Sequence, residues 1–193
     1  MTFRQLEQAL QAVGDLLEAE HLHEAIIVVG GVALNMLGLL QRTTQDVDII
    51  ARGIAPTSEL ETALQLLNPD PLPDGLVRAI ATVARDFGLP PDWMNTEVAM
   101  QWRFGLPPSI KEDLTWRRFG GLSIGLAGRR TIIALKLFAA VDQGPNSVHF
   151  QDLIALSPSS DELADAARWV YTQDASEDFP RLVDEVVQSL TEH

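Results

Sequence analysis

The sequence predicts an α+β fold, in which a small mixed β-sheet has helices packed on it and a C-terminal helical extension follows. Apolar residues recur with helical spacing near both ends of the chain, over residues 3–20 and 161–190. Between these ends lie short apolar runs with the composition of buried strands, at 25–29 and 46–51. The 193 residues are 46% hydrophobic and 21% charged, which indicates a compact chain with a proper core.

The first half of the chain alternates helices with strands. A helix over 3–20 leads to a strand at 25–29 that is rich in β-branched residues, and the second strand is at 46–51. Helical periodicity predicts three further helices in this half: 32–40, 57–67 and 76–87. Proline and glycine residues mark breaks at 68–75 and 88–95.

The second half begins with a predicted hairpin. Residues 114–119 and 122–127 have strand character, and Gly120-Gly121 between them is a typical turn. The helix predicted at 131–141 is too apolar to lie on the surface. Two more amphipathic helices are expected in the tail: 161–171 and 177–190. We expect a core domain over 1–156 and a helical extension over 157–193 that packs on it.

Charge and composition exclude several classes of function. The net charge of −13 repels polynucleotides, so we expect no general nucleic-acid binding. The chain has no cysteine, which excludes disulfides and zinc–thiolate sites. No apolar run reaches the roughly 18 residues that span a bilayer. Residues 1–24 lack the apolar core of a signal peptide, so we expect a cytoplasmic protein without membrane contact.

The segment 26–50 carries the clearest chemical pattern. Gly30-Gly31 ends the first strand and precedes a helix, which lets backbone N–H groups approach a phosphate, although the pair also suits a plain tight turn. Asp46 and Asp48 are two residues apart on a strand, so their carboxylates share one face. Two like charges held this close favour a cation between them, and Mg²⁺ prefers such oxygen ligands. The pattern predicts metal-assisted phosphoryl or nucleotidyl transfer.

Polar residues immediately before these carboxylates are candidates for ligand contacts. Arg42 either binds a phosphate or caps the negative end of the preceding helix. The hydroxyl of Thr43 or Thr44 can contact the ligand, although loop hydroxyls are common. We include Arg42 and Thr44 in the predicted nucleotide site.

A family resemblance rests on these residues. Two runs carry it: Gly30-Gly31-Val32-Ala33-Leu34 and Arg42-Thr43-Thr44-Gln45-Asp46-Val47-Asp48-Ile49. They resemble the nucleotidyltransferase superfamily related to DNA polymerase beta, and within it the AbiEii-type branch, which includes toxins of bacterial toxin–antitoxin systems. The resemblance is strong over 25–51 and weaker over 89–156. It implies a nucleotidyltransferase fold, an NTP substrate, and two Mg²⁺ ions held by Asp46 and Asp48.

Lys136 lies inside the apolar helix predicted at 131–141. A buried lysine needs a partner, unless its stem snorkels to the surface. In AbiEii-type proteins a lysine on a comparable helix faces the triphosphate, and an aspartate follows it. The resemblance therefore implies that Lys136 neutralises phosphate charge and that Asp152 orients the lysine or the acceptor hydroxyl. The predicted catalytic set is Asp46, Asp48, Lys136 and Asp152, and the predicted nucleotide contacts are Gly30, Gly31, Arg42, Thr44 and Lys136.

The chain departs from the superfamily in one respect. Many members carry a third carboxylate on a later strand, which activates the attacking hydroxyl. The segments 114–118 and 122–126 contain no acidic residue. The general-base step would then fall to Asp152, to Glu97 or to no residue, and a catalytically degenerate domain becomes an alternative.

Three hypotheses follow for function. The first is an enzyme that transfers a nucleoside monophosphate from an NTP to a hydroxyl of an RNA end, a protein or a small molecule. The toxin resemblance favours tRNA or protein as acceptor and implies an antitoxin protein as partner. The second is a degenerate relative that binds nucleotide or docks its acidic surface on a basic partner. The third is a structural domain with a chance motif.

Two smaller features leave alternatives open. Trp93 in the 91–95 segment, which resembles a Trp-Leu-Asn element of short relatives, either stacks on a base or closes the core. Arg117-Arg118 and Arg129-Arg130 are either solvated ends of strands or an edge that binds the acceptor.

Overall fold

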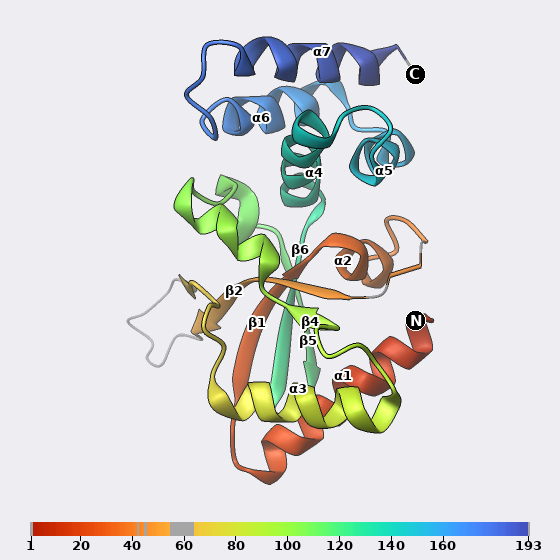
Figure 1. Cartoon of the computed structure of the whole chain (residues 1–193), viewed down its shortest axis with the longest axis vertical. Coiled ribbons are helices and arrows are strands. Elements are labelled where there is room, and N and C mark those ends of the chain that lie inside the picture. The colour runs from red at the N-terminus through yellow and green to blue at the C-terminus, as the bar shows by residue number, and fades with distance from the viewer. Residues whose placement is uncertain (1, 42, 45, 55–63, 193) are drawn as a thin grey trace. The chain divides into compact units, whose positions relative to one another are not determined.

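A computed structural model describes residues 2–41, 43–44, 46–54 and 64–192 (Figure 1). It confirms the predicted α+β class, with a mixed six-stranded sheet and helices at both ends of the chain. None of the helices in these ranges is both long and apolar enough to cross a membrane.

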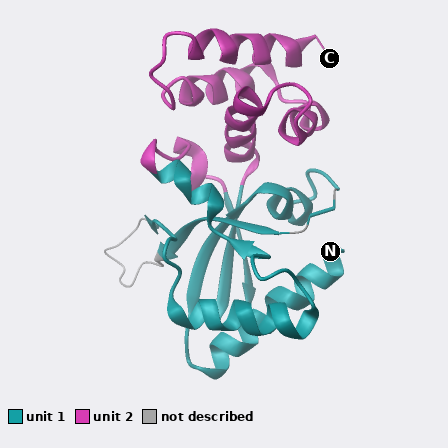
Figure 2. Ribbon diagram, in the orientation of Figure 1, with its two compact units in different colours: residues 1–102, 114–127 teal, residues 103–113, 128–193 magenta. Residues whose placement is uncertain are grey.

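The chain forms two compact units (Figure 2). Unit 1 consists of Met1–Trp102 and Leu114–Ala127, and unit 2 consists of Arg103–Asp113 and Gly128–His193. The division that the sequence suggests between residues 156 and 157 stays a prediction.

Unit 1 contains the sheet. Its strands are β1 (Glu24–Val29), β2 (Val47–Ile54), β3 (Gln65–Leu67), β4 (Met94–Asn95), β5 (Leu114–Phe119) and β6 (Leu122–Ala127). The order is β3-β2-β1-β6-β5, and β4 pairs with β2 outside this path. β1 is antiparallel to β2 and parallel to β6. It is therefore a central strand, and its last four residues are all buried, which explains the continuous apolar run in the sequence.

Helices of unit 1 pack on this sheet. They are α1 (Phe3–Ala19) and α2 (Gly30–Met36), while α3 (Asp74–Phe87) packs on α1 and the 3-10 helix η1 (Glu97–Arg103) follows β4. α1 approaches the β5–β6 hairpin closely at Gly14, whose carbonyl accepts a hydrogen bond from the Gly121 N–H at 2.9 Å. A Cβ at Gly14 would lie 1.6 Å from the Phe119 carbonyl oxygen, so only glycine permits this contact.

Unit 2 is helical. It contains η2 (Pro108–Lys111), α4 (Arg129–Gln143), α5 (Val148–Leu156), α6 (Ser160–Val170) and α7 (Phe179–Thr191). α4 packs against the other three α-helices, which agrees with the prediction that it is too apolar for the surface. Phe138 of α4 contributes edge-to-face contacts with Trp169 and Phe179, at ring-centre distances of 6.1 and 6.4 Å.

The predicted elements differ from the structure at several places. The helix expected at 57–67 is wrong over Gln65–Leu67, which form β3 by pairing with β2. Residues 57–63 of that prediction lie outside the described residues. α2 begins at Gly30 itself and ends at Met36, so the helix expected at 32–40 is shorter and starts earlier. The break expected at 88–95 contains β4, and α5 was not predicted.

Candidate functional site

The Gly30-Gly31 pair lies at the carboxyl end of β1, where the chain turns directly into α2. Gly30 has φ of +68°, in the left-handed region where glycine is favoured. The preceding Val29 is extended and acts as the N-cap without a side-chain hydrogen bond. The glycine pair therefore forms the tight strand-to-helix turn that the sequence predicts.

Asp48 lies against this turn. The antiparallel register pairs Val29 with Asp48, so the start of β2 meets the end of β1. A Cβ at Gly30 would lie 2.1 Å from the Asp48 carboxylate oxygen Oδ2. The space beside the Gly30 backbone is thus occupied by a carboxylate, and the two halves of the predicted motif lie side by side.

Asp46 lies just before β2 and is exposed, whereas Asp48 is half-buried. The buried Thr44 donates a hydrogen bond from its hydroxyl to the Asp46 carbonyl oxygen at 3.1 Å, and its Oγ1 is 3.5 Å from Asp46 Oδ1. Thr44 therefore restrains the backbone at Asp46. Arg42, the other predicted ligand residue of this loop, lies outside the described residues.

The site suits Mg²⁺ only in combination with a ligand. Mg²⁺ commonly binds one or two carboxylates and completes its shell with water and phosphate oxygens. Within the described ranges, no three His, Cys, Asp or Glu side chains cluster in a way that could hold a metal ion by themselves. Asp46 and Asp48 supply two carboxylates, a number of protein ligands that Mg²⁺ accepts when water and phosphate oxygens complete its shell.

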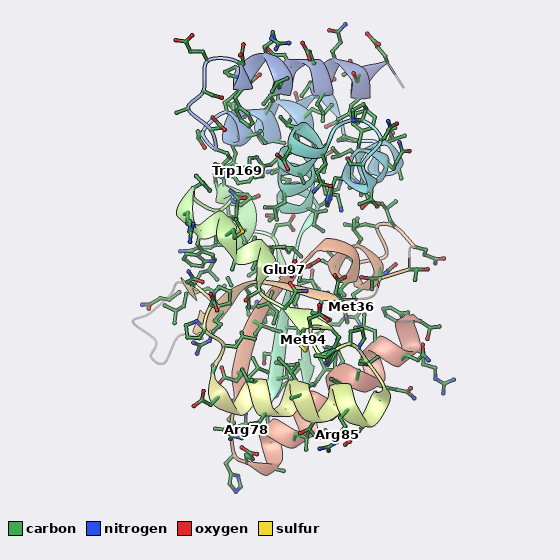
Figure 3. The ribbon with its side chains drawn as sticks, in the orientation of Figure 1. Met36, Arg78, Arg85, Met94, Glu97 and Trp169 are labelled. Carbon is green, nitrogen blue, oxygen red and sulfur yellow. The ribbon has the colours of Figure 1, made fainter. Side chains whose placement is uncertain are left out.

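Sequence reasoning missed that Asn95 adjoins this site. β4 runs parallel to β2 and pairs Asp48 with Asn95. Figure 3 labels Met94, the other residue of β4. The only signal in the sequence is the Trp93-Met94-Asn95 element. Trp93 is 1% exposed and its indole N–H donates to the Ile80 carbonyl at 3.3 Å, so it closes the core. The structure gives no support to its stacking on a base.

Lys136 and Asp152 form a buried ion pair in unit 2. Lys136 on α4 and Asp152 on α5 are 6% and 8% exposed, and Lys136 Nζ lies 2.6 Å from Asp152 Oδ2. The lysine therefore does not snorkel. The structure brings together the two residues that the family resemblance links, and the aspartate neutralises the lysine charge.

The basic pairs are largely engaged within the protein. Arg117 donates to the Met36 carbonyl at 3.3 Å, and Arg118 to the Gly120 carbonyl at 3.0 Å. Arg129 makes two hydrogen bonds with the Glu162 carboxylate, at 2.7 and 3.2 Å. These arginines have structural partners, which weakens the prediction of an acceptor-binding edge.

Unit 2 also contains a cavity of about 460 Å³. Its walls come from η2, α4, α6 and neighbouring residues: Pro107, Pro108, Ser109, Glu112, Arg130, Ala134, Glu162, Asp165, Ala166, Arg168, Trp169 and Thr172. The buried Trp169 indole N–H has no acceptor in the described part of the chain. Neither Lys136 nor Asp152 lines this cavity, so the ion pair and the cavity are separate features.

Comparisons with known proteins add no family assignment. No family model, no curated protein and no solved structure matches the chain.

Proposed function

We propose that this chain is a Mg²⁺-dependent nucleotidyltransferase that transfers a nucleoside monophosphate from an NTP to a hydroxyl group. The contact between Asp48 and Gly30 is the observation that supports it most. It places a half-buried carboxylate directly against the glycine turn that ends β1. A half-buried carboxylate beside a strand-to-helix turn is the arrangement that the proposed site for a metal-bound triphosphate requires.

The proposed reaction is an in-line displacement at the α-phosphorus. The acceptor oxygen attacks this atom, the bond to the oxygen that bridges to the β-phosphate breaks, and pyrophosphate leaves with that electron pair. The proton of the acceptor hydroxyl passes to a base or to water. Mg²⁺, when bound, supplies charge neutralisation at the attacking and leaving oxygens. Asp46 and Asp48 would hold the metal, and the tight turn at Gly30 and Gly31 would lie beside the phosphates.

The other predicted residues enter the proposal with separate roles. Thr44 orients Asp46 through the hydrogen bond to its carbonyl. The phosphate-binding role of Lys136 and the orienting role of Asp152 are drawn from the family resemblance, and that of Arg42 from its position just before the two aspartates. The Lys136–Asp152 ion pair supports the orienting role, since the carboxylate fixes the position of the ammonium group.

The acceptor and the biological setting are also proposals. The resemblance favours a tRNA end or a protein side chain as acceptor, and a small molecule is the further possibility. We further propose that the protein is cytoplasmic and, as the resemblance implies, a toxin that is neutralised by an antitoxin protein. The net charge of −13 fits selective rather than general binding of nucleic acid.

A label-transfer experiment tests the reaction. The protein is incubated with Mg²⁺, a bacterial extract, and each NTP labelled at either the α- or the γ-phosphate. The proposal expects the α-label, but not the γ-label, to appear on RNA, protein or a small molecule. The Asp48→Asn variant, which removes the charge and keeps the shape, serves as the control and should transfer no label. Transfer that is equal in this variant contradicts the proposal.

One observation favours a second candidate, a degenerate domain that binds nucleotide or a partner protein without catalysis. Neither β5 nor β6 contains an acidic residue, and in the superfamily a later strand often carries the general base. This candidate predicts Mg²⁺-dependent NTP binding that depends on Asp46 and Asp48, with no α-label transfer to any fraction of the extract.

A further inference from the structure

Asn95 lies directly beside Asp48 in the sheet. The parallel register of β2 and β4 pairs Val47 with Met94 and Asp48 with Asn95. Paired residues project to the same face of a sheet. Val47 and Met94 are buried, at 0% and 4% exposure, while Asp48 and Asn95 are only half-buried. The Asn95 amide therefore shares the more open face with the Asp48 carboxylate.

The segment that carries Asn95 is fixed against β2 on both sides. Before it, the Trp93 carbonyl accepts a hydrogen bond from the Val47 N–H at 2.7 Å. After it, the Trp102 indole N–H donates to the Ile50 carbonyl at 2.6 Å. Anchors at both ends hold Asn95 in one place beside Asp48, as a binding residue requires.

The orientation of the Asn95 amide is also fixed. Its Oδ1 accepts a hydrogen bond from the Glu97 N–H at 3.0 Å, which is an Asx turn. An amide has a separate NH₂ group with two donors. No group in the described part of the chain accepts a hydrogen bond from Asn95 Nδ2. The donors are thus left for a ligand on the open face.

We infer that Asn95 is a nucleotide-binding residue, whose Nδ2 group donates a hydrogen bond to an oxygen of the NTP held at Asp46 and Asp48. The inference rests on the proposed function and adds a residue to its site. Carboxylates only accept hydrogen bonds, so a neutral donor next to Asp48 gives the ligand a contact that the aspartates do not supply. Both a phosphate oxygen and a ribose hydroxyl accept such a bond.

Calorimetric titration in Mg²⁺ tests the inference with three variants. Asn95→Ala removes the whole amide. Asn95→Asp keeps an oxygen that accepts the Glu97 N–H, so the turn is preserved, and it replaces the donor by a negative charge. Asn68→Ala is the matched control, because Asn68 Oδ1 accepts the Asp70 N–H at 3.0 Å in an equivalent turn next to β3. The probes are the NTP that binds wild type most tightly, its 2′-deoxy and 3′-deoxy forms, and inorganic tripolyphosphate.

Asn95→Ala is expected to bind the NTP about tenfold more weakly, the effect of one lost hydrogen bond, while Asn68→Ala binds like wild type. Asn95→Asp is expected to bind more weakly as well, because the donor is lost and its charge repels the phosphates. If the donor contacts a ribose hydroxyl, one deoxy nucleotide binds wild type and Asn95→Ala equally well. If it contacts a phosphate, tripolyphosphate binding falls in parallel. Unchanged NTP affinity in both Asn95 variants, or an equal loss in Asn68→Ala, overturns the inference and leaves the proposed function standing. Absence of NTP binding by the wild-type protein overturns both.

Discussion

The carboxylate of Asp48 occupies the place that a side chain at Gly30 would take. A Cβ there would lie 2.1 Å from Asp48 Oδ2, and the φ of +68° is itself unfavourable for other residues. The glycine and the aspartate are eighteen residues apart in the sequence and meet because β1 and β2 pair in antiparallel register. The glycine is therefore required both by the turn and by the carboxylate beside it.

Gly30→Ala is expected to impair ligand binding more than folding. The positive φ costs about 1–2 kcal/mol in unfolding free energy. The clash is relieved when the Asp48 side chain moves away, which displaces the proposed metal ligand. Gly38→Ala is the matched control, since Gly38 also has φ of +68° and nothing lies within 4 Å of its Cβ position. Urea denaturation should give similar losses for both variants, and calorimetry should show at least a tenfold loss of Mg²⁺–NTP affinity only for Gly30→Ala. Equal affinities in the two variants would contradict this role.

Replacing one partner of the Lys136–Asp152 pair is expected to destabilise the protein more than replacing both. Asp152→Leu or Lys136→Met leaves a buried charge without its partner, which costs about 3–5 kcal/mol in unfolding free energy. The double variant Lys136→Met/Asp152→Leu should recover most of this loss. A double-mutant cycle by chemical denaturation checks the expectation.

The double variant also tests the phosphate-binding role that the family resemblance implies for Lys136, because it should fold and yet bind tripolyphosphate more weakly than wild type. Unchanged tripolyphosphate binding would make the pair structural only.

Stability should depend on pH through Glu162. The hydrogen bonds from the Arg129 guanidinium hold the pKa of the Glu162 carboxyl below its ordinary value, although partial burial acts in the opposite direction. Because the pKa of Glu162 is lower in the folded than in the unfolded protein, the ionised carboxylate stabilises the fold. This stabilisation is fully present above the unfolded-state pKa and disappears as the pH falls through the folded-state pKa. Glu162→Gln should therefore lose about 1 kcal/mol at pH 7. The difference from wild type, measured by denaturation at a series of pH values, should shrink below about pH 4.5. A difference that is constant down to pH 2 would exclude the ion pair as its cause.

Gly14→Ala should destabilise the protein, although in a helix interior alanine is usually more favourable than glycine by about 1 kcal/mol of folding free energy. The added Cβ meets the backbone oxygen of Phe119, which cannot rotate away, so the helix or the hairpin has to shift. The expected loss is about 2 kcal/mol or more in unfolding free energy. Gln8→Ala on the exposed face of the same helix is the control and should have a small effect. Stabilisation by Gly14→Ala would mean that α1 does not pack on the hairpin in this way.

Elements with a strong local signal could be predicted from the sequence. The β5–β6 hairpin has the predicted bounds, because strand-like residues flank two glycines in a tight turn. β3 could not be predicted, since Gln65–Leu67 has helical periodicity with the residues before it and becomes a strand only by pairing with β2. β4 has two residues and no local signal. Both β3 and β4 form only because they pair with β2 in the folded chain.

The candidate site likewise could be predicted from the sequence only where its residues lie close together along the chain. Gly30, Gly31, Asp46 and Asp48 could be chosen from one short segment, because their spacing on a strand and a turn carries chemical meaning. Asn95 lies 47 residues beyond Asp48 in the sequence and reaches it only through the β2–β4 register. The ion pair of Lys136 and Asp152 joins two helices, and only the family resemblance linked them in advance.

Binding of the four NTPs by calorimetry, first with Mg²⁺ and then with EDTA, tests the proposed nucleotide site most directly. We expect at least one NTP to bind in Mg²⁺ and to be released by EDTA. Asp46→Asn and Asp48→Asn should abolish this binding while the thermal unfolding temperature stays close to that of wild type. Binding that both variants retain, or binding that EDTA does not affect, would contradict the assignment of these two aspartates to a metal–nucleotide site. Failure of every NTP to bind would contradict the nucleotidyltransferase proposal as a whole.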